Sequence, residues 1–335
     1  MSVTEKVKVA LVGCGGFSLR AQEGIVQSEM LQIVACYDPN RAAATEAAAR
    51  HGATCCDSFE QALGAPGIEA VVLITPNHLH RDHAVAALAA GKHVYVEKPM
   101  ANTMAECRAM IRAAEQARRL LMVGHLTRRR KSFRLLQEAV RTGRLGRPLG
   151  AEAQFSHGAG LALNPAAWRA DPARCPGLPL NVIGCHLADV LNMLFGRPRT
   201  VAAFHRRAVV PTNDDCTSTL IAYDQPVTAS LISHYSSGSQ VHEVRVVGTA
   251  GVAEVHGNGQ EFVLRLGKEV VDRQQIGEEH ALAEEFAVFG RAIRHGEPLE
   301  TDGLAGALVV AITEASVISA REQRFVETSE LLGNL

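Results

Sequence analysis

The sequence predicts an α/β protein with two domains. Residues 1–124 are expected to form a doubly wound parallel sheet, and residues 125–335 an α+β domain with a mostly antiparallel sheet. Three observations predict this division. A chain of 335 residues is long for one core, and its hydrophobic content of 47% is enough for two. Short apolar runs alternate with helical segments in the first third of the chain, and patterns of alternating residues replace them from about residue 125.

Five apolar runs in the first domain have the length that a buried parallel strand needs. The segments between them are helical. "DPNRAAATEAAARHG" is rich in alanine and stops at Gly52, Asp57 with Glu60 makes a capping box, and Thr103 with Glu106 makes a second one. Repeated strand and helix predict right-handed crossovers and a parallel sheet. The five runs span residues 7–13, 31–38, 70–75, 93–99 and 120–125.

The second domain begins with a helix around residues 132–141. Alternating segments follow, which predict strands with one covered face. An apolar helix at 181–195 interrupts them, and two more helices are expected at about 280–295 and 302–321. The expected strands lie in "GAEAQFSH", "TVAAFHRRAVV", "TSTLIAYD", "VTASLISHYS", "HEVRVVGTAG" and "EFVLRL".

Charge and composition narrow the classes of partner. The 34 Lys and Arg residues balance 35 Asp and Glu residues, so no general field attracts nucleic acid or an anionic membrane. The start "MSVTEKVKVALVG" passes directly into a strand pattern, which predicts no secretion signal. The uncharged stretch 303–313 is far shorter than the ~20 residues of a membrane span. We therefore expect small molecules, or further copies of the chain, as partners.

The eight cysteines show no C-x-x-C spacing and no His-rich metal pattern. We therefore expect reduced thiols, a cytoplasmic protein and no metal site. Cys185 stands beside His186, but neighbours in a helix point about 100° apart, which favours a buried structural thiol over a nucleophile with its base.

A dinucleotide fingerprint is present in "VGCGGFS". Gly13, Gly15 and Ser18 occupy its three positions directly after the first strand, where the backbone must approach a pyrophosphate. Asp38 follows 20 residues after Ser18, at the end of the second strand, where a carboxylate can accept both ribose hydroxyls. The alternative is a steric glycine turn followed by an ordinary helix-start acid. The carboxylate favours NAD over NADP, although Arg41 stands three residues further on.

The ends of two further strands are expected at the same ligand-binding edge of the parallel sheet. "TPNHLH", residues 75–80, follows one strand at the edge where an open parallel sheet binds ligands. Asn77 there is equally suited to a simple helix cap, and the two roles can coexist. Lys98 precedes a proline, which holds it extended and keeps it out of a helix. We expect its amine to project from the strand end into the crevice.

These motifs resemble those of the glucose-fructose oxidoreductase and inositol dehydrogenase family (Gfo/Idh/MocA). The resemblance covers nearly the whole chain and rests on "GCGGFS", "TPNHLH", "EKP", "VGH", "GRLGRP", "WRADPARCPG", "GCHLADVLNMLFG" and "EEFAVFGRAIRHGEPLETDG". It implies a Rossmann domain followed by an α+β domain whose open sheet commonly mediates a homodimer or homotetramer. It also implies a sugar, cyclitol or sugar derivative as substrate, oxidised or reduced at a ring carbon.

The resemblance assigns catalytic roles to Lys98 and His186, which flank the substrate hydroxyl in that family. Hydride transfer from a carbinol carbon leaves a proton that an amine or imidazole must take up. One position departs from the family: it often has an aspartate four residues before the histidine, where Val182 stands here. Asn181 is adjacent but turned by about 100° in an α-helix.

Other side chains are weaker candidates. The basic run "TRRRKSFR" is typical of a solvated helix face, although an arginine pointing inward would suit an acidic sugar. Trp168 and Arg169 lie in the family's loop over nicotinamide and substrate, with ordinary packing as the alternative. The expected substrate contacts are Lys98, His125, Arg128, His157, Asn181 and His186. The expected cofactor contacts are Gly13, Gly15, Gly16, Phe17, Ser18, Asp38, Thr75, Pro76, Asn77, His80, Glu97, Lys98, Trp168 and Arg169.

Three functions are compatible with these residues. The leading one is an NAD-dependent sugar or cyclitol dehydrogenase, because Lys98 and His186 are both present. The second is a redox-neutral lyase or glycosidase-type enzyme in which retained NAD transiently oxidises the sugar. The third is a regulator that senses sugar or NAD without chemistry; the intact "EKP" argues against it and Val182 argues for it.

Overall fold

The structure is a computed structural model that describes residues 5–333. The chain forms two compact units. The sequence predicts that every residue after 124 belongs to the second domain, whereas in the structure residues 280–306 belong to the first unit. The first unit comprises the chain up to Ala101, Ala105–Leu126 and His280–Gly306; the second comprises Asn102–Met104, Thr127–Glu279 and the chain from Ala307.

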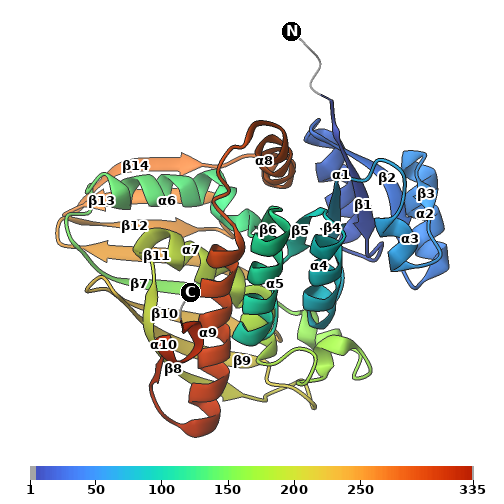
Figure 1. Cartoon of the computed structure of the whole chain (residues 1–335). Coiled ribbons are helices and arrows are strands. Elements are labelled where there is room, and N and C mark those ends of the chain that lie inside the picture. The colour runs from blue at the N-terminus through green and yellow to red at the C-terminus, as the bar shows by residue number, and fades with distance from the viewer. Residues whose placement is uncertain (1–4, 334–335) are drawn as a thin grey trace. The chain divides into compact units, whose positions relative to one another are not determined.

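The first unit contains the predicted parallel sheet. Its six strands follow the order β3-β2-β1-β4-β5-β6 (Figure 1). The order reverses between β1 and β4, and in open parallel sheets ligands generally bind beyond the carboxyl ends of the strands at such a point. The shortest strand was not predicted, since two residues carry no period. The strands are β1 (Val7–Val12), β2 (Leu31–Tyr37), β3 (Thr54–Cys55), β4 (Ala70–Leu73), β5 (His93–Glu97) and β6 (Leu121–Gly124).

The helices between these strands begin and end close to the predicted residues. Asn40 caps α2 by accepting from the Ala42 N–H at 3.2 Å, and Gly52 ends it with a φ of 61°. The predicted cap Asp57 is wrong by one residue, because Ser58 accepts from the backbone N–H at the start of α3. The helices are α1 (Ser18–Gln27), α2 (Arg41–His51), α3 (Phe59–Leu63), the 3₁₀ turn η1 (Asn77–Leu79), α4 (His80–Ala89) and α5 (Met104–Ala117).

Helix α8 (Ala281–His295) belongs to the first unit although it lies far along the chain. Phe286 and Phe289 are fully buried in the core of this unit. The Phe286 ring lies 4.7 Å from that of Tyr95 on β5. Leu282 packs against Gly24 of α1, where a Cβ would come within 2.8 Å of the leucine Cγ. The late segment therefore completes the core of the dinucleotide-type sheet.

The second unit is built on a nine-stranded sheet in the order β14-β13-β12-β11-β7-β10-β9-β8-β15. The sheet is mostly antiparallel, as predicted, and β7 and β10 form a parallel pair. The sequence analysis did not identify β12, β14 or β15 as separate strands. The strands are β7 (Pro148–Ser156), β8 (Pro198–Arg206), β9 (Cys216–Tyr223), β10 (Thr228–His234), β11 (Val241–Gly248), β12 (Gly251–His256), β13 (Glu261–Leu266), β14 (Glu269–Gln275) and β15 (Val326–Glu327).

Helices cover one face of this sheet (Figure 1). Leu191 from α7 and Ile312 from α9 are buried there together with Phe262 of the sheet. All three have less than 2% of their surface exposed, so this face supplies the core of the second unit. The helices are α6 (Lys131–Arg141), α7 (Cys185–Phe195), α9 (Gly303–Glu322) and α10 (Ser329–Leu332), with 3₁₀ turns η2 (Leu126–Arg129), η3 (Ala159–Ala162) and η4 (Trp168–Ala170) and a π turn η5 (Leu180–Gly184).

Helix α9 is longer than the uncharged stretch suggested. An 18-residue window of this 20-residue helix has a mean hydropathy of 1.8, so by length and composition the helix could cross a membrane. However, 61% of its apolar window is buried inside the protein. Burial of this kind is what a core helix requires, and the helix packs against the sheet through Val309, Ile312 and Ala315.

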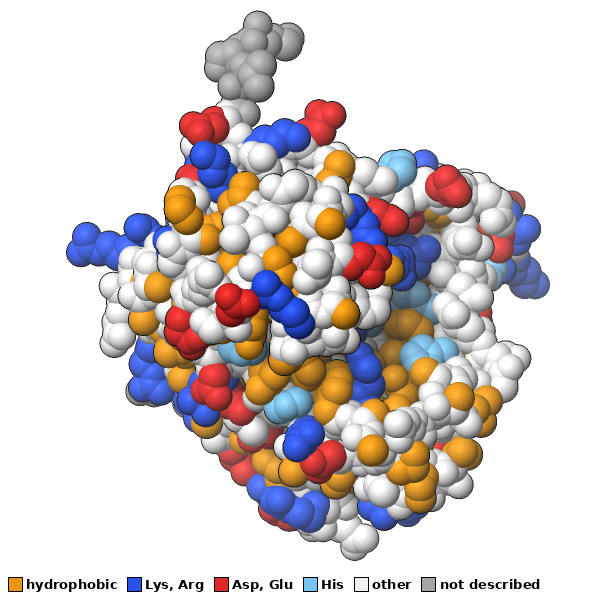
Figure 2. Space-filling model, turned by 90° about the vertical axis from the view of Figure 1, so that its right-hand side faces the viewer, with side chains coloured by type: hydrophobic (Ala, Val, Ile, Leu, Met, Phe, Trp, Pro, Cys, Tyr) orange, Lys and Arg blue, Asp and Glu red, His pale blue; other side chains and the backbone are white. Residues whose placement is uncertain are grey.

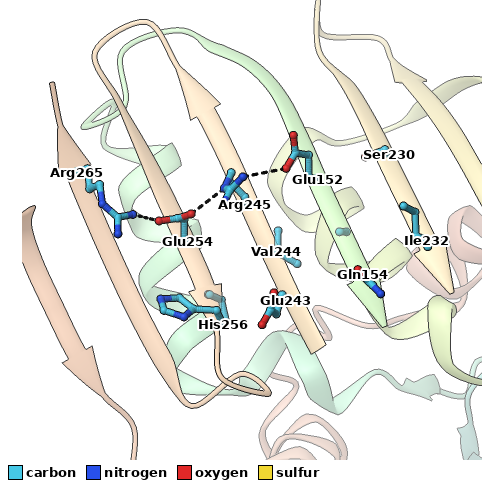
Figure 3. Close-up of a pocket in the computed structure, with 12 residues that line it drawn as sticks. Glu152, Gln154, Ser230, Ile232, Glu243, Val244, Arg245, Glu254, His256 and Arg265 are labelled. Atoms are coloured by element: carbon cyan, nitrogen blue, oxygen red, sulfur yellow. Dashed lines mark hydrogen bonds and ion pairs between the residues drawn. The ribbon is translucent and has the colours of Figure 1, made fainter. Parts of the chain in front are cut away.

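The opposite, outer face of the sheet carries a row of alternating charges (Figure 3). Arg245 pairs with Glu152 at 3.2 Å and with Glu254 at 2.7 Å, and Glu254 also pairs with Arg265. These residues line a hollow of about 520 Å³. Further along the same face, Phe204 and Leu220 are 67% and 54% exposed.

Charges of both signs are also mixed over the visible molecular surface (Figure 2). This mixing matches the formal net charge of −1. Neither the mixed charges on this face nor the net charge indicates a broad electrostatic field of one sign.

Candidate active site

The turn after β1 leaves its backbone open on one side. Gly13 has a φ of 92°, and its N–H donates to the Tyr37 carbonyl at 2.9 Å. A Cβ here would collide with the carbonyl group of Ile74, so only glycine fits. At Gly15 and Gly16 a Cβ would meet no other described atom within 4 Å. The turn therefore has the exposed backbone that a pyrophosphate site requires.

Helix α1 begins directly after this turn, so its first N–H groups lie at the same place. Phe17 occupies the N-cap position and has no side-chain acceptor to cap them. Ser18 is fully buried, and its hydroxyl accepts from Gln22 Nε2 at 3.1 Å. The Ser18 side chain thus packs inside the first unit, as a small residue at the third fingerprint position does, and its cofactor contact stays a prediction.

Asp38 joins the end of β2 to the glycine turn. Its Oδ2 accepts from the Cys14 N–H at 2.8 Å, and its Oδ1 accepts from the Asn40 N–H at 2.7 Å. These bonds hold the half-buried carboxylate at the carboxyl end of the strand. Arg41, the cation three residues further on, pairs with Asp57 at 2.8 Å. The negative charge of Asp38 is therefore held where the ribose of a dinucleotide is expected.

His80 links the segment after β4 to the segment after β5. It is 1% exposed; Nε2 lies 2.9 Å from the Thr75 carbonyl oxygen and Nδ1 lies 2.8 Å from that of Pro99. Burial lowers the pKa of His80 to about 4, although both carbonyl groups act in the opposite direction, so the ring is neutral near pH 7. Both nitrogens face backbone carbonyl oxygens, and the single N–H of the neutral ring donates to one of them. His80 therefore supports two turns, and its cofactor contact stays a prediction.

Thr75 offers an unused hydroxyl at this edge of the sheet. Its Oγ1 is buried and has no hydrogen-bond partner among the described residues. Pro76 is half-buried, and Asn77 is 3% exposed at the start of η1. A buried hydroxyl without a protein partner suits a ligand. Together with the open glycine backbone and the start of α1, it makes the first unit fit a bound dinucleotide.

Strand β5 ends at the residues quoted in the "EKP" motif. Lys98 is half-buried, its N–H donates to Glu97 Oε2 at 3.1 Å, and its peptide bond to Pro99 is cis. Glu97 is 6% exposed, and its other oxygen lies 3.2 Å from the Tyr95 hydroxyl. The Glu97 carboxyl thus belongs to the interior of the first unit. His125, which follows β6, is also fully buried.

In the second unit, His186 lies in the first turn of α7. Its Nδ1 is 3.2 Å from the Thr127 hydroxyl, and its ring centre is 5.8 Å from that of Phe155. Thr127 is 3% exposed, so this contact orients the imidazole and influences its tautomer. The sequence analysis missed Thr127 because a threonine before a run of arginines carries no functional signal.

Arg128 anchors the same helix through Asp189, three residues after His186. Its Nε donates to Asp189 Oδ2 at 2.7 Å, and its Nη2 donates to Oδ1 at 2.5 Å. The arginine is 7% exposed and the aspartate 0%. A two-point ion pair with a buried carboxylate occupies the guanidinium fork. This geometry argues against the predicted substrate contact of Arg128 and makes it a support for α7.

The segment before α7 is a π turn, which changes where Asn181 lies. The Cys185 N–H donates to the Leu180 carbonyl, so the turn holds one residue more than an α turn. Asn181 therefore lies about one turn before His186, and the predicted 100° offset does not apply. Its Nδ2 donates to Asn102 Oδ1 at 3.2 Å, and its buried Oδ1 has no hydrogen-bond partner among the described residues. Val182 instead packs with the apolar cluster around Tyr235.

Aromatic side chains surround the remaining candidates of the second unit. The Arg169 guanidinium lies 4.4 Å from the centre of the Trp168 ring, and its Nε is buried without a hydrogen-bond partner among the described residues. The His157 ring lies 4.8 Å from that of Tyr235, and its Nδ1 accepts from the Ala159 N–H at 3.1 Å. Tyr235, 5% exposed, was not predicted because it lies in a strand-like segment without a motif.

Each unit brings its own candidates together. In the first unit, the glycine turn, Asp38, Thr75 and Lys98 lie at the carboxyl ends of β1, β2, β4 and β5. In the second, Thr127, Phe155 and His186 are in contact. Within residues 5–333, no group of three or more His, Cys, Asp and Glu side chains could hold a metal ion.

Comparisons with known proteins match both units. Residues 7–125 match the model of an oxidoreductase family with an NAD-binding Rossmann fold, GFO_IDH_MocA, and residues 133–254 match the GFO/IDH/MocA C-terminal domain. The chain is 36% identical over 137 residues to 1,5-anhydro-D-fructose reductase of Ensifer adhaerens, an alignment that covers 41% of this chain and 40% of the reductase. It is 27% identical to D-apiose dehydrogenase of Paraburkholderia graminis over 98% of this chain and 92% of that protein.

The structure agrees with these matches. The crystal structure of aldose-aldose oxidoreductase from Caulobacter crescentus, complexed with glycerol, is similar with a TM-score of 0.88 at 25% identity. The similarity covers 96% of this chain and all of the other. The alignments with the Ensifer adhaerens reductase and with two further curated relatives cover 40%, 44% and 62% of the lengths of those proteins.

Proposed function

Because the chain belongs to the GFO/IDH/MocA family of NAD-binding oxidoreductases, we propose that it moves a hydride between nicotinamide and a ring carbon bearing a hydroxyl group. The substrate class is a sugar, a cyclitol or a sugar derivative. The observation that carries the proposal is the position of Lys98 at the end of β5, at the same edge of the sheet as the open glycine turn and Asp38. Relatives named as sugar reductase and sugar dehydrogenase support the substrate class.

The first unit has the residues that a dinucleotide needs. The backbone at Gly15 and Gly16 and the first turn of α1 would bind the pyrophosphate. Asp38 would accept both hydroxyls of the adenosine ribose, and its charge would repel a 2′-phosphate. Arg41, which could otherwise neutralise that phosphate, is paired with Asp57. NAD is therefore the proposed cofactor in preference to NADP.

Lys98 and His186 handle the proton of the reacting hydroxyl. When bound, the nicotinamide supplies the hydride acceptor for oxidation and the hydride donor for reduction. The Lys98 amine takes the hydroxyl proton during oxidation and returns it during reduction. His186, oriented by Thr127, shares that hydroxyl or passes the proton on. Arg128 supports His186 through Asp189 on the same helix.

Asn181 is the proposed replacement for the aspartate that relatives often carry. Its amide nitrogen is used by Asn102, and its buried oxygen remains available to a substrate hydroxyl next to the reacting one. An amide oxygen accepts a hydrogen bond without bringing a charge. His157 completes the proposed sugar contacts, and Trp168 and Arg169 are the proposed cofactor contacts of the second unit.

A screen of polyols and sugars with NAD and NADP tests the proposal. The purified protein should form reduced nicotinamide with at least one polyol or sugar, faster with NAD than with NADP. A redox-neutral enzyme would instead contain retained cofactor and change the sugar without net reduced nicotinamide. Binding of NAD and sugar without conversion of any substrate would contradict the proposal and indicate a regulator.

We further propose that the outer face of the nine-stranded sheet joins copies of the chain as a homodimer or homotetramer. This face carries Phe204 and Leu220, which are more than half exposed. The neighbouring charge row of Glu152, Arg245 and Glu254 alternates in sign. Such a row can pair with its own copy turned by a two-fold axis.

A further inference from the structure

A buried cluster of three titratable side chains lies next to Lys98. Tyr95 and Glu97 come from β5, and Glu285 comes from α8 of the same unit. Their exposed fractions are 0%, 6% and 0%. The Tyr95 hydroxyl oxygen lies 3.2 Å from Glu97 Oε1 and 2.9 Å from Glu285 Oε2. Gly124 of β6 makes room for the cluster, because a Cβ there would collide with the tyrosine hydroxyl.

The number of hydrogens in this cluster decides its charge. A tyrosine hydroxyl has one hydrogen and can donate to one carboxyl group at a time. If both glutamates were ionised, the second carboxylate would face the hydroxyl oxygen with no hydrogen between them. A proton on one carboxyl group removes this conflict, because that group then donates to the tyrosine while the tyrosine donates to the other. The geometry therefore favours a carboxylic acid at one end.

The two contact distances of the Tyr95 hydroxyl indicate which end carries the proton. Glu97 Oε2 accepts from the Lys98 N–H at 3.1 Å, a contact that both the acid and the carboxylate can make. Its Oε1 faces the Tyr95 hydroxyl and is placed to carry the proton. The shorter contact, 2.9 Å, is the one to Glu285, as expected when the acceptor is charged.

We propose that Glu97 is a neutral carboxylic acid at pH 7, that it donates to Tyr95, and that Tyr95 donates to an ionised Glu285. Burial raises the pKa of Glu97, and the nearby Lys98 offsets only part of this. Burial also raises the pKa of Tyr95 well above its usual value, so the phenol keeps its hydrogen. The charged or titratable groups next to Glu97 include Tyr95 of β5 and Lys98, which directly follows β5, and Glu285 of α8 lies on the other side of Tyr95.

This protonation state matters for Lys98 and rests, in this respect, on the proposed function. An ionised carboxylate beside the lysine would stabilise its ammonium form and raise its pKa. An ammonium group has no lone pair for the proton of a substrate hydroxyl. A neutral Glu97 keeps that charge away, so Glu97 acts as a positioning residue that tunes the environment of the lysine.

Infrared difference spectroscopy of the full-length protein tests the protonation state directly. At pH 7 we expect the carbonyl stretching band of a buried carboxylic acid, shifted in D₂O, and we expect Glu97→Gln to remove it. Glu69→Gln is the matched control: Glu69 is ion-paired with Arg294 in the same unit, and its loss should leave the band unchanged. Absence of an acid band at pH 7, or a band that Glu285→Gln removes and Glu97→Gln retains, would overturn the proposal.

A second variant, Tyr95→Phe, tests the same hydrogen bond if Glu97→Gln does not fold. Tyr95→Phe removes the acceptor of the acid hydrogen, so the same band should persist and move to higher frequency. An unmoved band would mean that the acid does not donate to Tyr95.

Turnover provides the functional test. Glutamine copies the neutral acid, since its amide nitrogen can donate to Tyr95 and its oxygen can accept from the Lys98 N–H. We expect Glu97→Gln to leave the pH profile of turnover in place, because the variant removes no charge from the neighbourhood of Lys98. A shifted acidic limb would show that a charge was removed and would overturn the tuning role. The infrared result needs no substrate, so a protein without dehydrogenase activity would defeat the proposed function and leave the test of Glu97 intact.

Discussion

Asp38 combines two tasks at the residue scale, because it holds the glycine turn and faces the expected ribose. In Asp38→Ala the Cys14 N–H loses its acceptor and the ribose loses its carboxylate. Hydrogen bonds to charged groups contribute about 1.5–3 kcal/mol, so NAD affinity should fall by roughly tenfold or more. The preference for NAD over NADP should narrow as well. Calorimetric titration of the parent protein and of Asp38→Ala with NAD and with NADP measures these affinities. Equal binding of NAD and NADP by the parent protein would contradict the role of Asp38.

Lys98 is expected to matter for chemistry and not for folding. Lys98→Met keeps the length of the side chain but removes the proton acceptor, so turnover should fall by roughly 10²- to 10⁴-fold. NAD affinity and the unfolding temperature should stay close to those of the parent. His186→Ala should also slow turnover, and the double variant should cost less than the sum of the two free energies if both groups serve one hydroxyl. Near-normal turnover in Lys98→Met would make the lysine a bystander.

His242 predicts a pH dependence of stability. Its ring is stacked on Phe155 at 4.2 Å, and burial lowers its pKa to about 3, with a smaller contribution from Arg130. The unfolded chain, with a histidine pKa near 6.5, therefore binds more protons than the folded one between these values. Stability from this group is lost as the pH falls from 6.5 towards 3, by about 2 kcal/mol between pH 7 and pH 5.

The variant His242→Phe isolates this effect. Denaturant unfolding at pH 7 and pH 5 should show a smaller loss in the variant than in the parent. His295→Phe, at the exposed end of α8, is the control and should behave like the parent. An equal acid loss in His242→Phe and the parent would mean that His242 does not titrate as inferred.

Residues whose roles depend on the local chain could be predicted from the sequence, whereas those that depend on distant partners could not. Gly13 and Lys98 follow strands with recognisable turns, and their positions at the sheet edge agree with the prediction. His80 and Arg128 were expected to touch ligands, but distant groups, the Pro99 carbonyl and Asp189, occupy them. No sequence period reveals such partners.

At the scale of elements, the π turn before α7 absorbs one residue. Deleting Val182 should convert it into an α turn and leave Asn181 four residues before His186, near its present direction. We expect this deletion variant to fold, to retain most of its turnover and to keep the contact between Asn181 and Asn102. Asn181→Ala should lose more turnover than the deletion. Melting curves and steady-state kinetics of both variants provide the test; equal losses would mean that the inserted residue itself has a function.

The same turn explains an error in the sequence analysis. The expected 100° offset of Asn181 assumed regular α-helical geometry, and nothing in "LPLNVIGCH" signals a wider turn. Long periodic elements were predicted well, including α6 and α8. The two-residue strands β3 and β15 could not be, because they exist only through their neighbours.

At the scale of the whole molecule, the outer sheet face predicts the oligomeric state. Phe204 and Leu220 are exposed on adjacent strands, so a double change to Asp should prevent association by placing charge in an apolar interface. Light scattering should report a dimer or tetramer for the parent and a monomer for the variant. Val270→Asp, an equally apolar but peripheral residue on β14, is the control and should remain associated. A monomeric parent at micromolar concentration would refute the proposed interface.

The position of α8 in the first unit, although it lies far along the chain, has a consequence for folding during translation. The six strands of that unit are translated within the first 124 residues, but Phe286 and Phe289 are translated only after eight of the nine strands of the second unit, β7 to β14. Until then the nascent sheet lacks part of its apolar cover around Tyr95 and exposes that surface to chaperones and to other chains. The domain that is translated first thus cannot complete its core until residues 286 and 289 have been made, long after its own six strands.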